Sequence, residues 1–513
     1  MKRKSVTKNL LFISLISFLC LWGVFLRAPE MISGNYLFGH DTGRDYLAAY
    51  NIVVNHKLTL IGAEAGSGVA GINGIFHGPG YFYLIALAFL LFHGDPIGGQ
   101  FFMFLFGVAT LILSTWAGYK MFGKIGSVLF LFFTAVSPLI ISQSRFIWSS
   151  HPLTFFVILA IYFVYRIPDN PELFAPLAVF TSGFTYNSQL GVAVPLMVSI
   201  LLSIPIVFKV RNWRVYVYSI VGAIFAFLPM ILFDVRHNFM AARSAFAYVS
   251  AGGSGSSSIF EAKRLHSHIF DYWNNFYNTF TFEFGWIPWK IQIIVLEVAT
   301  VFAGIGLWMV KDGRLKKIIF FLLLMSAFTW IAYLLLNNTV WDYYLTHTRI
   351  GYILLFTIAG ISLYRSYKKW PLAKIGAIVG IVFLFVVFYG SIFRQYVSYT
   401  IDIKDTGIYD KIQGKRFVID TIYKDAGGKP FSVFVFMPSV YTWPYDYLFK
   451  TYGLTRYGYE PAHVKNGLAY LIIEPDQSQP WRQNGWLVTV VEGGTTLWTK
   501  TLLNGLILIK RIY

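Results

Sequence analysis

Long apolar stretches recur along the first four-fifths of the chain and are separated by short polar gaps. Many of them approach the roughly 20 residues that a helix needs to cross the hydrocarbon core of a bilayer. Residues 191–208 (GVAVPLMVSILLSIPIVF), for example, offer no polar face to water. The pattern predicts eleven membrane spans, at residues 9–26, 98–119, 125–142, 152–166, 173–188, 190–208, 215–233, 286–309, 317–336, 350–364 and 373–392.

The composition supports a membrane protein over a soluble one. Only 13% of the residues are charged, 56% are hydrophobic and the mean hydropathy is +0.58, whereas soluble domains carry about 25% charged residues. A net charge of +18 in a soluble protein would suggest nucleic acid. In a membrane protein the placement of the charges matters more than their sum, so we expect no nucleic-acid partner. The single cysteine, Cys20, permits no intrachain disulfide.

The basic residues predict the topology. Lys and Arg gather in alternate gaps between the spans, which the positive-inside rule places in the cytoplasm. They all fall on one side only if residues 79–93 (PGYFYLIALAFLLFH) lie in the outer interface or re-enter the membrane instead of spanning it. Residues 1–26 resemble a secretory signal without a cleavage site, so we expect an uncleaved first helix and a cytoplasmic N-terminus in the cell membrane.

The end of the chain has a different character. From about residue 394 it becomes polar, and short segments such as FSVFVFMP and AYLIIEP are typical of strands bounded by turns. We therefore predict a transmembrane domain over residues 1–393 and a small extracytoplasmic α/β domain over 394–513. Residues 251–258 (AGGSGSSS) predict a flexible linker within a long outer loop.

Ionisable residues gather where the predicted spans meet the outer face. The five segments are 39–46 (GHDTGRDY), 76–83 (FHGPGYFY), 142–152 (SQSRFIWSSHP), 233–239 (FDVRHNF) and 341–349 (WDYYLTHTR). An unpaired charge at membrane depth costs about 2.5–3.5 kcal/mol, so charges at span ends tend to have a function. Because the topology was chosen from lysines and arginines elsewhere, the agreement of these five segments predicts one outer site.

The residue types suit an anionic, lipid-linked substrate. Arginine offers fixed planar donors to phosphate, and an aspartate near the membrane surface can serve as a general base for a hydroxyl. Simpler interpretations stand beside this one. Asp41 and Arg44 have the spacing of a helix-surface ion pair, and Arg145 and Arg236 have the positions of snorkelling span ends. The histidines lack a metal-ligand spacing, and the aromatic residues also fit an interfacial belt.

The first loop resembles that of GT-C fold glycosyltransferases, the superfamily of protein O-mannosyltransferases and aminoarabinose transferases. Asp41-Thr-Gly-Arg44-Asp45-Tyr46 keeps a D-x-x-R spacing after the first span, and His77-Gly-Pro-Gly-Tyr81 occupies the position of a second K-P-P or H-P-P motif. The likeness is greatest to bacterial members that read HD-x-GRD. It extends in pattern over about residues 1–360, although the strong motifs cover only some 45 residues.

The resemblance implies an all-α polytopic GT-C-like membrane domain. It also implies inverting transfer of a sugar from a polyprenyl-phosphate donor to a lipid, protein or glycan acceptor outside the cytoplasmic membrane. Asp41 matches the catalytic acid, and Asp45 is an extra acid that can assist or replace it. Many relatives hold a second carboxylate at the fourth span, where this chain has Ser149-Ser150-His151. That departure leaves a divalent metal cofactor open.

The resulting set of candidate residues falls into three groups. Asp41 and Asp45 are the candidate catalytic acids. Contacts to the donor phosphate are predicted for Arg44, His77, Arg145, Arg236 and Arg349. Contacts to the rest of the substrate are predicted for Tyr46, Tyr81, His151, His237, Tyr344 and His347.

Two other functions fit the same composition. A transporter or lipid flippase would use the charged outer residues as a vestibule, but it would also place polar residues near mid-membrane on broken helices. A scaffold or receptor would bind glycans through the outer domain without catalysis.

Overall fold

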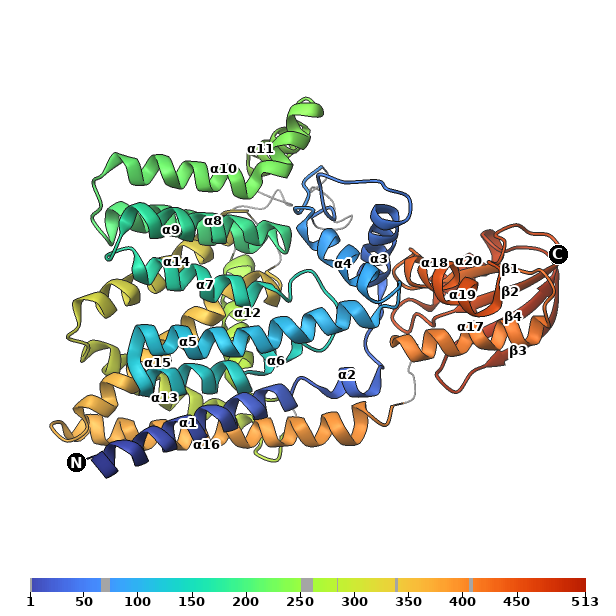
Figure 1. Cartoon of the computed structure of the whole chain (residues 1–513). Helices are drawn as coiled ribbons and strands as arrows, with labels where there is room; N and C mark the ends of the chain where they lie inside the picture. The colour runs from blue at the N-terminus through green and yellow to red at the C-terminus, as the bar shows by residue number, and fades with distance from the viewer. Residues whose placement is uncertain (1, 66–73, 251–261, 284, 337–339, 406–408) are drawn as a thin grey trace.

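The larger part of the molecule is a bundle of long helices that run roughly side by side (Figure 1). The computed structural model describes residues 2–65, 74–250, 262–283, 285–336, 340–405 and 409–513. Helices suit the predicted spans because a backbone in a bilayer must satisfy its own hydrogen bonds. The bundle helices are α1 (Lys2–Phe25), α5 (Ile97–Val136), α7 (Leu153–Arg166), α8 (Pro171–Phe184), α9 (Leu190–Ile206), α10 (Trp213–Arg236), α13 (Trp289–Trp308), α14 (Gly313–Leu336), α15 (Thr346–Ser366) and α16 (Pro371–Val397).

Helix α5 contains two of the predicted spans. The break lies at Gly123, whose φ of 76° and ψ of −167° are open essentially to glycine alone. The halves fold back on each other, and the Ser127 hydroxyl donates to the Thr115 carbonyl at 2.7 Å. The short helix α6 (Pro138–Ser142) completes the second half. Within the described residues, the eleven predicted spans thus correspond to the ten bundle helices.

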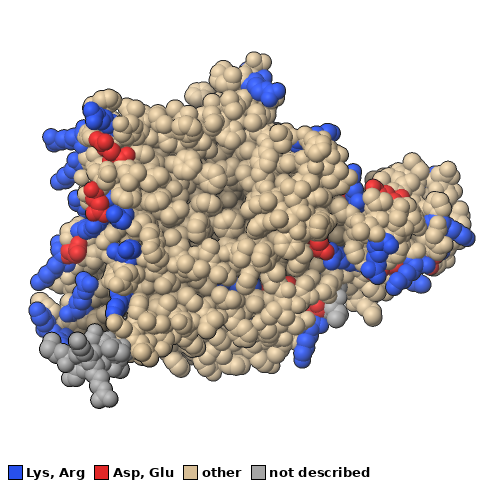
Figure 2. Space-filling view, viewed as in Figure 1, with Lys and Arg blue, Asp and Glu red and all other residues tan. Residues whose placement is uncertain are grey.

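Length and composition support a multi-pass membrane protein. Five of the described helices are long and apolar enough to cross a membrane, and four shorter apolar helices accompany them. Lys and Arg line the end of the bundle that holds the N-terminus, while the middle of the bundle shows almost no charge (Figure 2). The positive-inside rule assigns the basic end to the cytoplasm, so the orientation of the two termini stays a prediction.

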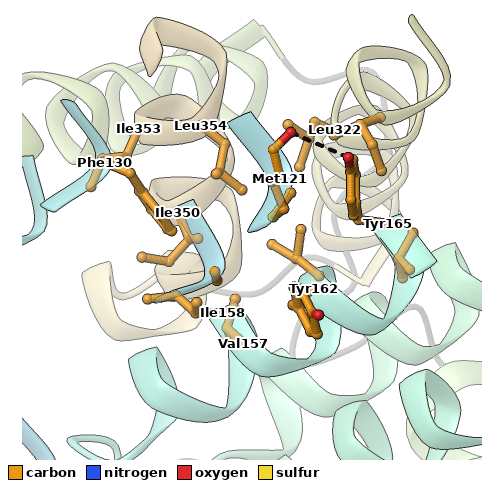
Figure 3. Close-up of a cluster of buried hydrophobic side chains, with 14 of the residues drawn as sticks. Met121, Phe130, Val157, Ile158, Tyr162, Tyr165, Leu322, Ile350, Ile353 and Leu354 are labelled. Carbon is orange, nitrogen blue, oxygen red and sulfur yellow. Dashed lines mark hydrogen bonds between the residues drawn. The ribbon is translucent and has the colours of Figure 1, made fainter. Parts of the chain in front are cut away.

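The bundle core is packed from aliphatic and aromatic side chains of α5, α7, α14 and α15. The labelled members in Figure 3 are Met121, Phe130, Val157, Ile158, Tyr162, Tyr165, Leu322, Ile350, Ile353 and Leu354. The two tyrosine hydroxyls drawn among them are both satisfied. The Tyr165 hydroxyl donates to the Met121 carbonyl at 3.2 Å, and the Tyr162 hydroxyl accepts from Arg166 at 2.9 Å. The outside of the bundle is apolar as well, as at Phe225 on α10, which is 63% exposed. Such an outside suits lipid and not water.

Among the described residues, four shorter helices lie at the end of the bundle opposite the N-terminus, and a fifth extends from there into the bundle. The four are α2 (Pro29–Ser33), α3 (His40–Val53), α4 (Gly80–Leu91) and α11 (Met240–Ser250), and the fifth is α12 (Ala262–Phe280), with single turns at η1 (Thr185–Asn187), η2 (Asp342–Leu345) and η3 (Ser398–Asp402). Helix α4 covers most of the segment predicted to be interfacial. Its 12 residues span about 18 Å, too little for a core of about 30 Å.

Helix α12 was not predicted, because its sequence mixes polar and aromatic residues. Its C-terminal part enters the bundle, where the Thr279 carbonyl accepts a hydrogen bond from Ser137 at 2.7 Å and Phe280 packs on Phe356 of α15 with ring centroids 4.9 Å apart. The predicted linker at 251–258 lies outside the described residues.

The C-terminal part is the predicted small α/β domain. Its four strands, β1 (Ser432–Phe436), β2 (Leu468–Ile473), β3 (Thr495–Thr501) and β4 (Ile507–Ile512), form one sheet in the order β1-β2-β4-β3. The pair β1–β2 is parallel and the other two pairs are antiparallel. The helical elements of the domain are α17 (Ile412–Ala426), α18 (Trp443–Leu448), η4 (Phe449–Gly453), α19 (Leu454–Tyr457) and α20 (Pro480–Thr489). Helix α16 and η3 run past the domain boundary predicted at 393, to Asp402.

The domain is joined by backbone hydrogen bonds to the segment between α2 and α3. The Phe38 N–H donates to Asp410 and the Ile412 N–H donates to Tyr36, each at 3.0 Å. A further hydrogen bond at 2.5 Å runs from the Tyr447 hydroxyl to the Gly94 carbonyl. In Figure 1, α3 and α4 accordingly lie between the bundle and the domain.

Candidate active site

Two aspartates and one arginine lie on the first turns of α3. Because residues three and four apart share a helix face, the side chains of Asp41, Arg44 and Asp45 converge. Arg44 contacts Asp41 through Nη1 at 2.9 Å, and it donates from Nε and Nη2 to Asp45 Oδ1 at 2.9 and 2.7 Å. One guanidinium therefore bridges two carboxylates, and the ionised cluster carries one net negative charge.

The two aspartates differ in environment and therefore in proton affinity. Burial raises the pKa of Asp41, but the hydrogen bond from His40 and the charge of Arg44 outweigh it, so this pKa lies below its ordinary value. The side chain of Asp41 is 40% exposed and that of Asp45 only 1%. Burial raises the pKa of Asp45 to about 6, against the opposing effect of Arg44. Asp41 is thus the ionised, accessible carboxylate, and Asp45 titrates near neutrality.

The second predicted motif is held beside this cluster. His77 N–H donates to the Ala63 carbonyl at 2.8 Å, and His77 Nδ1 accepts from the Leu190 N–H at 3.2 Å. The proton of the neutral ring therefore sits on Nε2. Burial, and then the charge of Arg44, lower the pKa of His77 to about 4. At neutral pH His77 is a hydrogen-bond donor without charge.

Contacts continue from His77 around to the other side of α3. Leu190 precedes Gly191, where an added Cβ would lie 3.3 Å from the Tyr344 ring. Tyr344 contacts Tyr343, whose ring packs edge-on against Trp148 with centroids 4.5 Å apart. The Thr42 hydroxyl then donates to the Ile147 carbonyl at 3.1 Å. The charge of Asp41 also contributes to raising the pKa of Tyr343, after burial. Four of the five predicted segments are joined in this ring.

Three buried polar atoms in this region have no hydrogen-bond partner among the described residues. They are Nε2 of His40, Oδ2 of Asp45 and the hydroxyl of Tyr81. Buried polar atoms are nearly always paired, so such a group calls for an explanation. His40 Nε2 and Asp45 Oδ2 belong to α3. The Tyr81 hydroxyl lies close to Asp45, since the charge of Asp45, after burial, raises the pKa of Tyr81. These atoms are free to accept hydrogen bonds from a further group or to donate to it.

Arg145 lies in a different cluster. Its guanidinium donates from Nε to both oxygens of Glu30 at 2.8 Å, from Nη1 to Ser398 at 2.8 Å and from Nη2 to Asp402 at 2.7 Å. These partners come from α2 and from η3 at the end of α16. The structure therefore gives Arg145 the geometry of a clamp between α2 and the last bundle helix, with its donors directed to protein groups and not to the α3 cluster.

Arg236 and His237 lie at the turn from α10 to α11. Both are exposed, and within the described chain no ion pair joins either of them to the α3 cluster. Asp234 beside them accepts from the N–H groups of Ala241 and Ala242 at 2.7 and 2.9 Å, so it caps α11. His237 Nδ1 bonds to the Phe233 carbonyl at 2.7 Å. The fifth predicted segment thus contacts the second through apolar rings, Phe233 and Phe76, whose centroids are 5.6 Å apart, while Asp234 and His237 bond locally.

Arg349 is buried near His151, on the side of the ring of contacts that contains Trp148 and Tyr343. It is 1% exposed and donates from Nη2 to the carbonyl and carboxylate of Asp342 at 3.2 and 3.1 Å, while its Nε has no partner among the described residues. Its charge helps to lower the pKa of His151 to about 3, although burial is the larger cause. His151 Nδ1 bonds to the Phe146 carbonyl at 2.6 Å, and His347 Nε2 bonds to Thr329 at 2.8 Å.

Tyr46 and Tyr81 are both fully enclosed. The Tyr46 hydroxyl donates to the Pro96 carbonyl at 3.1 Å and accepts from the Gly99 N–H at 2.8 Å, so its polar tip is already satisfied by the start of α5. Tyr81 has no such partner. Of these two predicted substrate contacts, only Tyr81 keeps an unpartnered hydroxyl among the described residues, whereas Tyr46 fixes α3 to the start of α5.

Sequence reasoning missed three participants. His40 lies 3.4 Å from Asp41, and it packs on Trp443 and Tyr441 of the C-terminal domain, with ring centroids 4.3 and 5.5 Å away. The sequence pattern marks His40 only as a histidine without metal-ligand spacing. Nothing in the sequence linked residues about 400 positions apart.

A metal ion has no evident place in the α3 cluster. Among the residues that the structure describes, no group of three or more His, Cys, Asp or Glu is arranged to hold one. Between the two carboxylates, where a cation would bind, the guanidinium of Arg44 already lies. The residues present therefore do not fit a metal ion bound between Asp41 and Asp45. Adding EDTA to an activity assay tests metal dependence.

Comparison with known proteins agrees with this architecture. No family model and no curated protein sequence matches the chain. Among solved structures it is similar to ArnT from Cupriavidus metallidurans, a GT-C aminoarabinose transferase crystallised with undecaprenyl phosphate. The match covers 98% of both chains with a TM-score of 0.53 and 13% sequence identity. The chain has the GT-C fold. The predicted fold class is confirmed, and at this identity the likeness concerns the fold alone.

Proposed function

We propose that this GT-C chain transfers a sugar from a polyprenyl-phosphate donor to an acceptor hydroxyl, with inversion, at the outer face of the cytoplasmic membrane. The observation that carries the proposal is the juxtaposition on α3 of an accessible, ionised Asp41 with the cation of Arg44, beside neutral His77. The crystal structure of ArnT with undecaprenyl phosphate supports a lipid donor of this class.

The two chemical tasks of the reaction fall to different residues. Asp41 takes the proton of the acceptor hydroxyl as the oxygen attacks the sugar C1. The bond between C1 and the phosphate oxygen breaks, its electron pair stays on the oxygen, and polyprenyl phosphate leaves. Arg44 and the Nε2–H of His77 stabilise that leaving phosphate by hydrogen bonds. Attack from the face opposite the phosphate inverts the configuration.

The α3 cluster cannot neutralise a phosphate alone, because its own net charge is already negative. Of the arginines predicted to help, Arg145 is saturated by Glu30, Ser398 and Asp402, and Arg236 is exposed at another turn. Arg349 is buried beside the ring and has an unpartnered Nε. We therefore assign the second phosphate contact to Arg349.

Replacing Arg349 tests this assignment. Arg349→Gln is expected to raise the KM for the donor about tenfold or more, because a charged hydrogen bond contributes roughly 1.5–3 kcal/mol. Arg236→Gln is the matched control and should leave the donor KM unchanged. Steady-state kinetics in proteoliposomes with varied donor give both values. Equal donor KM values for the two variants would remove Arg349 from the phosphate site.

The pH dependence should report Asp45. Below its pKa of about 6 Asp45 becomes protonated, the two charged hydrogen bonds from Arg44 weaken, and the guanidinium loses its fixed orientation. Transfer should therefore fall as the pH drops from 7 to 5, with a midpoint near 6. In Asp45→Asn the rate should be low throughout, with no step at that pH. A step that persists in Asp45→Asn would assign it to another group.

A strain lacking the protein separates transfer from transport. An enzyme acting outside leaves its lipid-linked sugar accumulating in the outer leaflet, where a membrane-impermeant oxidant destroys it before extraction and mass spectrometry. Loss of a flippase leaves the lipid in the inner leaflet, protected from the oxidant. Outer-leaflet accumulation that is reversed by the wild-type chain and not by Asp41→Asn supports the proposal. Inner-leaflet accumulation contradicts it.

A further inference from the structure

The C-terminal domain touches α3 at the first turn of the helix, next to the proposed base. An added Cβ on Gly43 would lie 2.4 Å from the Pro444 nitrogen and 2.6 Å from the Trp443 carbonyl carbon. These are backbone atoms that cannot swing away, so only glycine permits this approach. The glycine between Asp41 and Arg44 therefore serves to seat the segment around Trp443 on α3.

Three aromatic rings meet at this contact. The rings of Tyr441 and Trp443 are nearly parallel, with an interplanar angle of 12° and centroids 4.4 Å apart, and the Trp443 and His40 centroids are 4.3 Å apart. We refer to His40, Tyr441 and Trp443 as the aromatic platform. His40 also reaches Asp41, at 3.4 Å between Nδ1 and Oδ1. The platform therefore borders the carboxylate directly.

The platform is presented to the surroundings and not buried as a core. Tyr441 is 56% exposed and the preceding Val440 is 67% exposed, while Trp443 is half-buried. In contrast, His40 Nε2 is buried and has no hydrogen-bond partner among the described residues. Tyr441 stacks on Trp443 and is itself mostly exposed, so aromatic surface lies open beside the unpartnered Nε2 of His40. Ligand sites combine such apolar surface with a few placed polar groups.

The support of the platform is rigid and partly strained. Val440 has φ of 70°, a left-handed value that is unusual for a β-branched residue. Its N–H donates to the Met437 carbonyl at 2.9 Å. On the other side, Thr442 donates to Asp446 at 2.9 Å and the Tyr445 hydroxyl donates to Glu474 at 3.0 Å. Strained backbone held by its surroundings tends to occur at binding and catalytic sites.

We propose that the aromatic platform binds a sugar ring of the acceptor, so that the acceptor is a glycan and one of its hydroxyls faces Asp41. This rests on the function proposed above. A sugar ring has an apolar C–H face that fits a flat aromatic surface and a rim of hydroxyls that remains free. Whatever stacks on Trp443 lies beside the base, so the platform selects the acceptor and the C-terminal domain completes the active site.

Glycan binding by the full-length protein in detergent tests the proposal. The probes are an array of defined oligosaccharides, with soluble chitotriose, maltotriose and mannotriose as competitors. Wild type is expected to retain at least one oligosaccharide. Tyr441→Ala and Trp443→Ala should weaken that binding about tenfold, since truncating an aromatic residue at the centre of a contact costs at least on that order. Trp481→Ala, at a 69% exposed tryptophan on α20, is the matched control and should bind as wild type.

Two further variants keep the result interpretable. Trp443→Phe retains a ring and should restore most of the binding, whereas a merely structural loss in Trp443→Ala would also lower the unfolding temperature. Asp41→Asn keeps the platform and should retain most of the glycan binding, while it transfers sugar about 10³-fold more slowly. The proposal is overturned if wild type retains no oligosaccharide or if Trp443→Ala binds as wild type. Normal transfer by Asp41→Asn would overturn the proposed function instead.

Discussion

Asp41→Asn is expected to lower the rate of sugar transfer about 10³-fold, with donor binding nearly unchanged. A positioned general base contributes roughly 10²–10⁴ in rate, and the amide that replaces the carboxylate cannot accept the proton of the acceptor hydroxyl. The change is nearly isosteric, and the position is 40% exposed, so the fold should tolerate it. Single-turnover transfer with the donor prebound measures the chemical step directly.

Asp45→Asn provides the comparison for this result. Asp45 is buried behind Arg44 and acts on the substrate only through that guanidinium. Its loss should therefore cost less in the chemical step than the loss of Asp41 and should alter the pH profile described above. If Asp45→Asn abolishes transfer while Asp41→Asn retains it, the two aspartates exchange roles and the base is the buried one.

Arg145→Gln is expected to destabilise the folded protein by about 3 kcal/mol and to leave the donor KM unchanged. Removing one partner of a buried charge cluster leaves the others uncompensated, at a cost of roughly 3–5 kcal/mol. The lower end applies here because Glu30 and Asp402 are 12% and 26% exposed. Thermal unfolding in detergent reports the stability, and donor KM at low temperature reports the binding.

The matched control for Arg145→Gln is a double change. Glu30→Gln together with Arg145→Gln removes opposite charges and should recover part of the lost stability. A raised donor KM in Arg145→Gln at full stability would return this arginine to the phosphate site and contradict the clamp described above.

The sequence alone determined the fold class of the molecule and the placement of the α3 cluster on one helix. The apolar stretches have lengths set by the bilayer, and charged residues in their gaps are excluded from it, so the fold class of a multi-pass helical membrane protein follows without tertiary information. The motif D-T-G-R-D likewise shows its own geometry, because spacing along one helix places Asp41, Arg44 and Asp45 on one face. Helix α12 and strand β3 were missed, because a mixed polar and aromatic helix and the polar segment TTLWTKT carry no clear apolar period.

Only the tertiary structure decided which of the candidates lie together. Arg145, Arg236 and Arg349 are equivalent in the sequence, as arginines at outer span ends, and they separate only through their partners. Arg145 is paired with Glu30 and Asp402, and Arg236 is exposed beside the cap of α11. Arg349 is buried and paired with Asp342, close to the aromatic residues that contact one another near α3. The meeting of His40 with Trp443 depends on a domain that folds some 400 residues later. Such contacts are set by packing between distant segments, and no local pattern of residues encodes them.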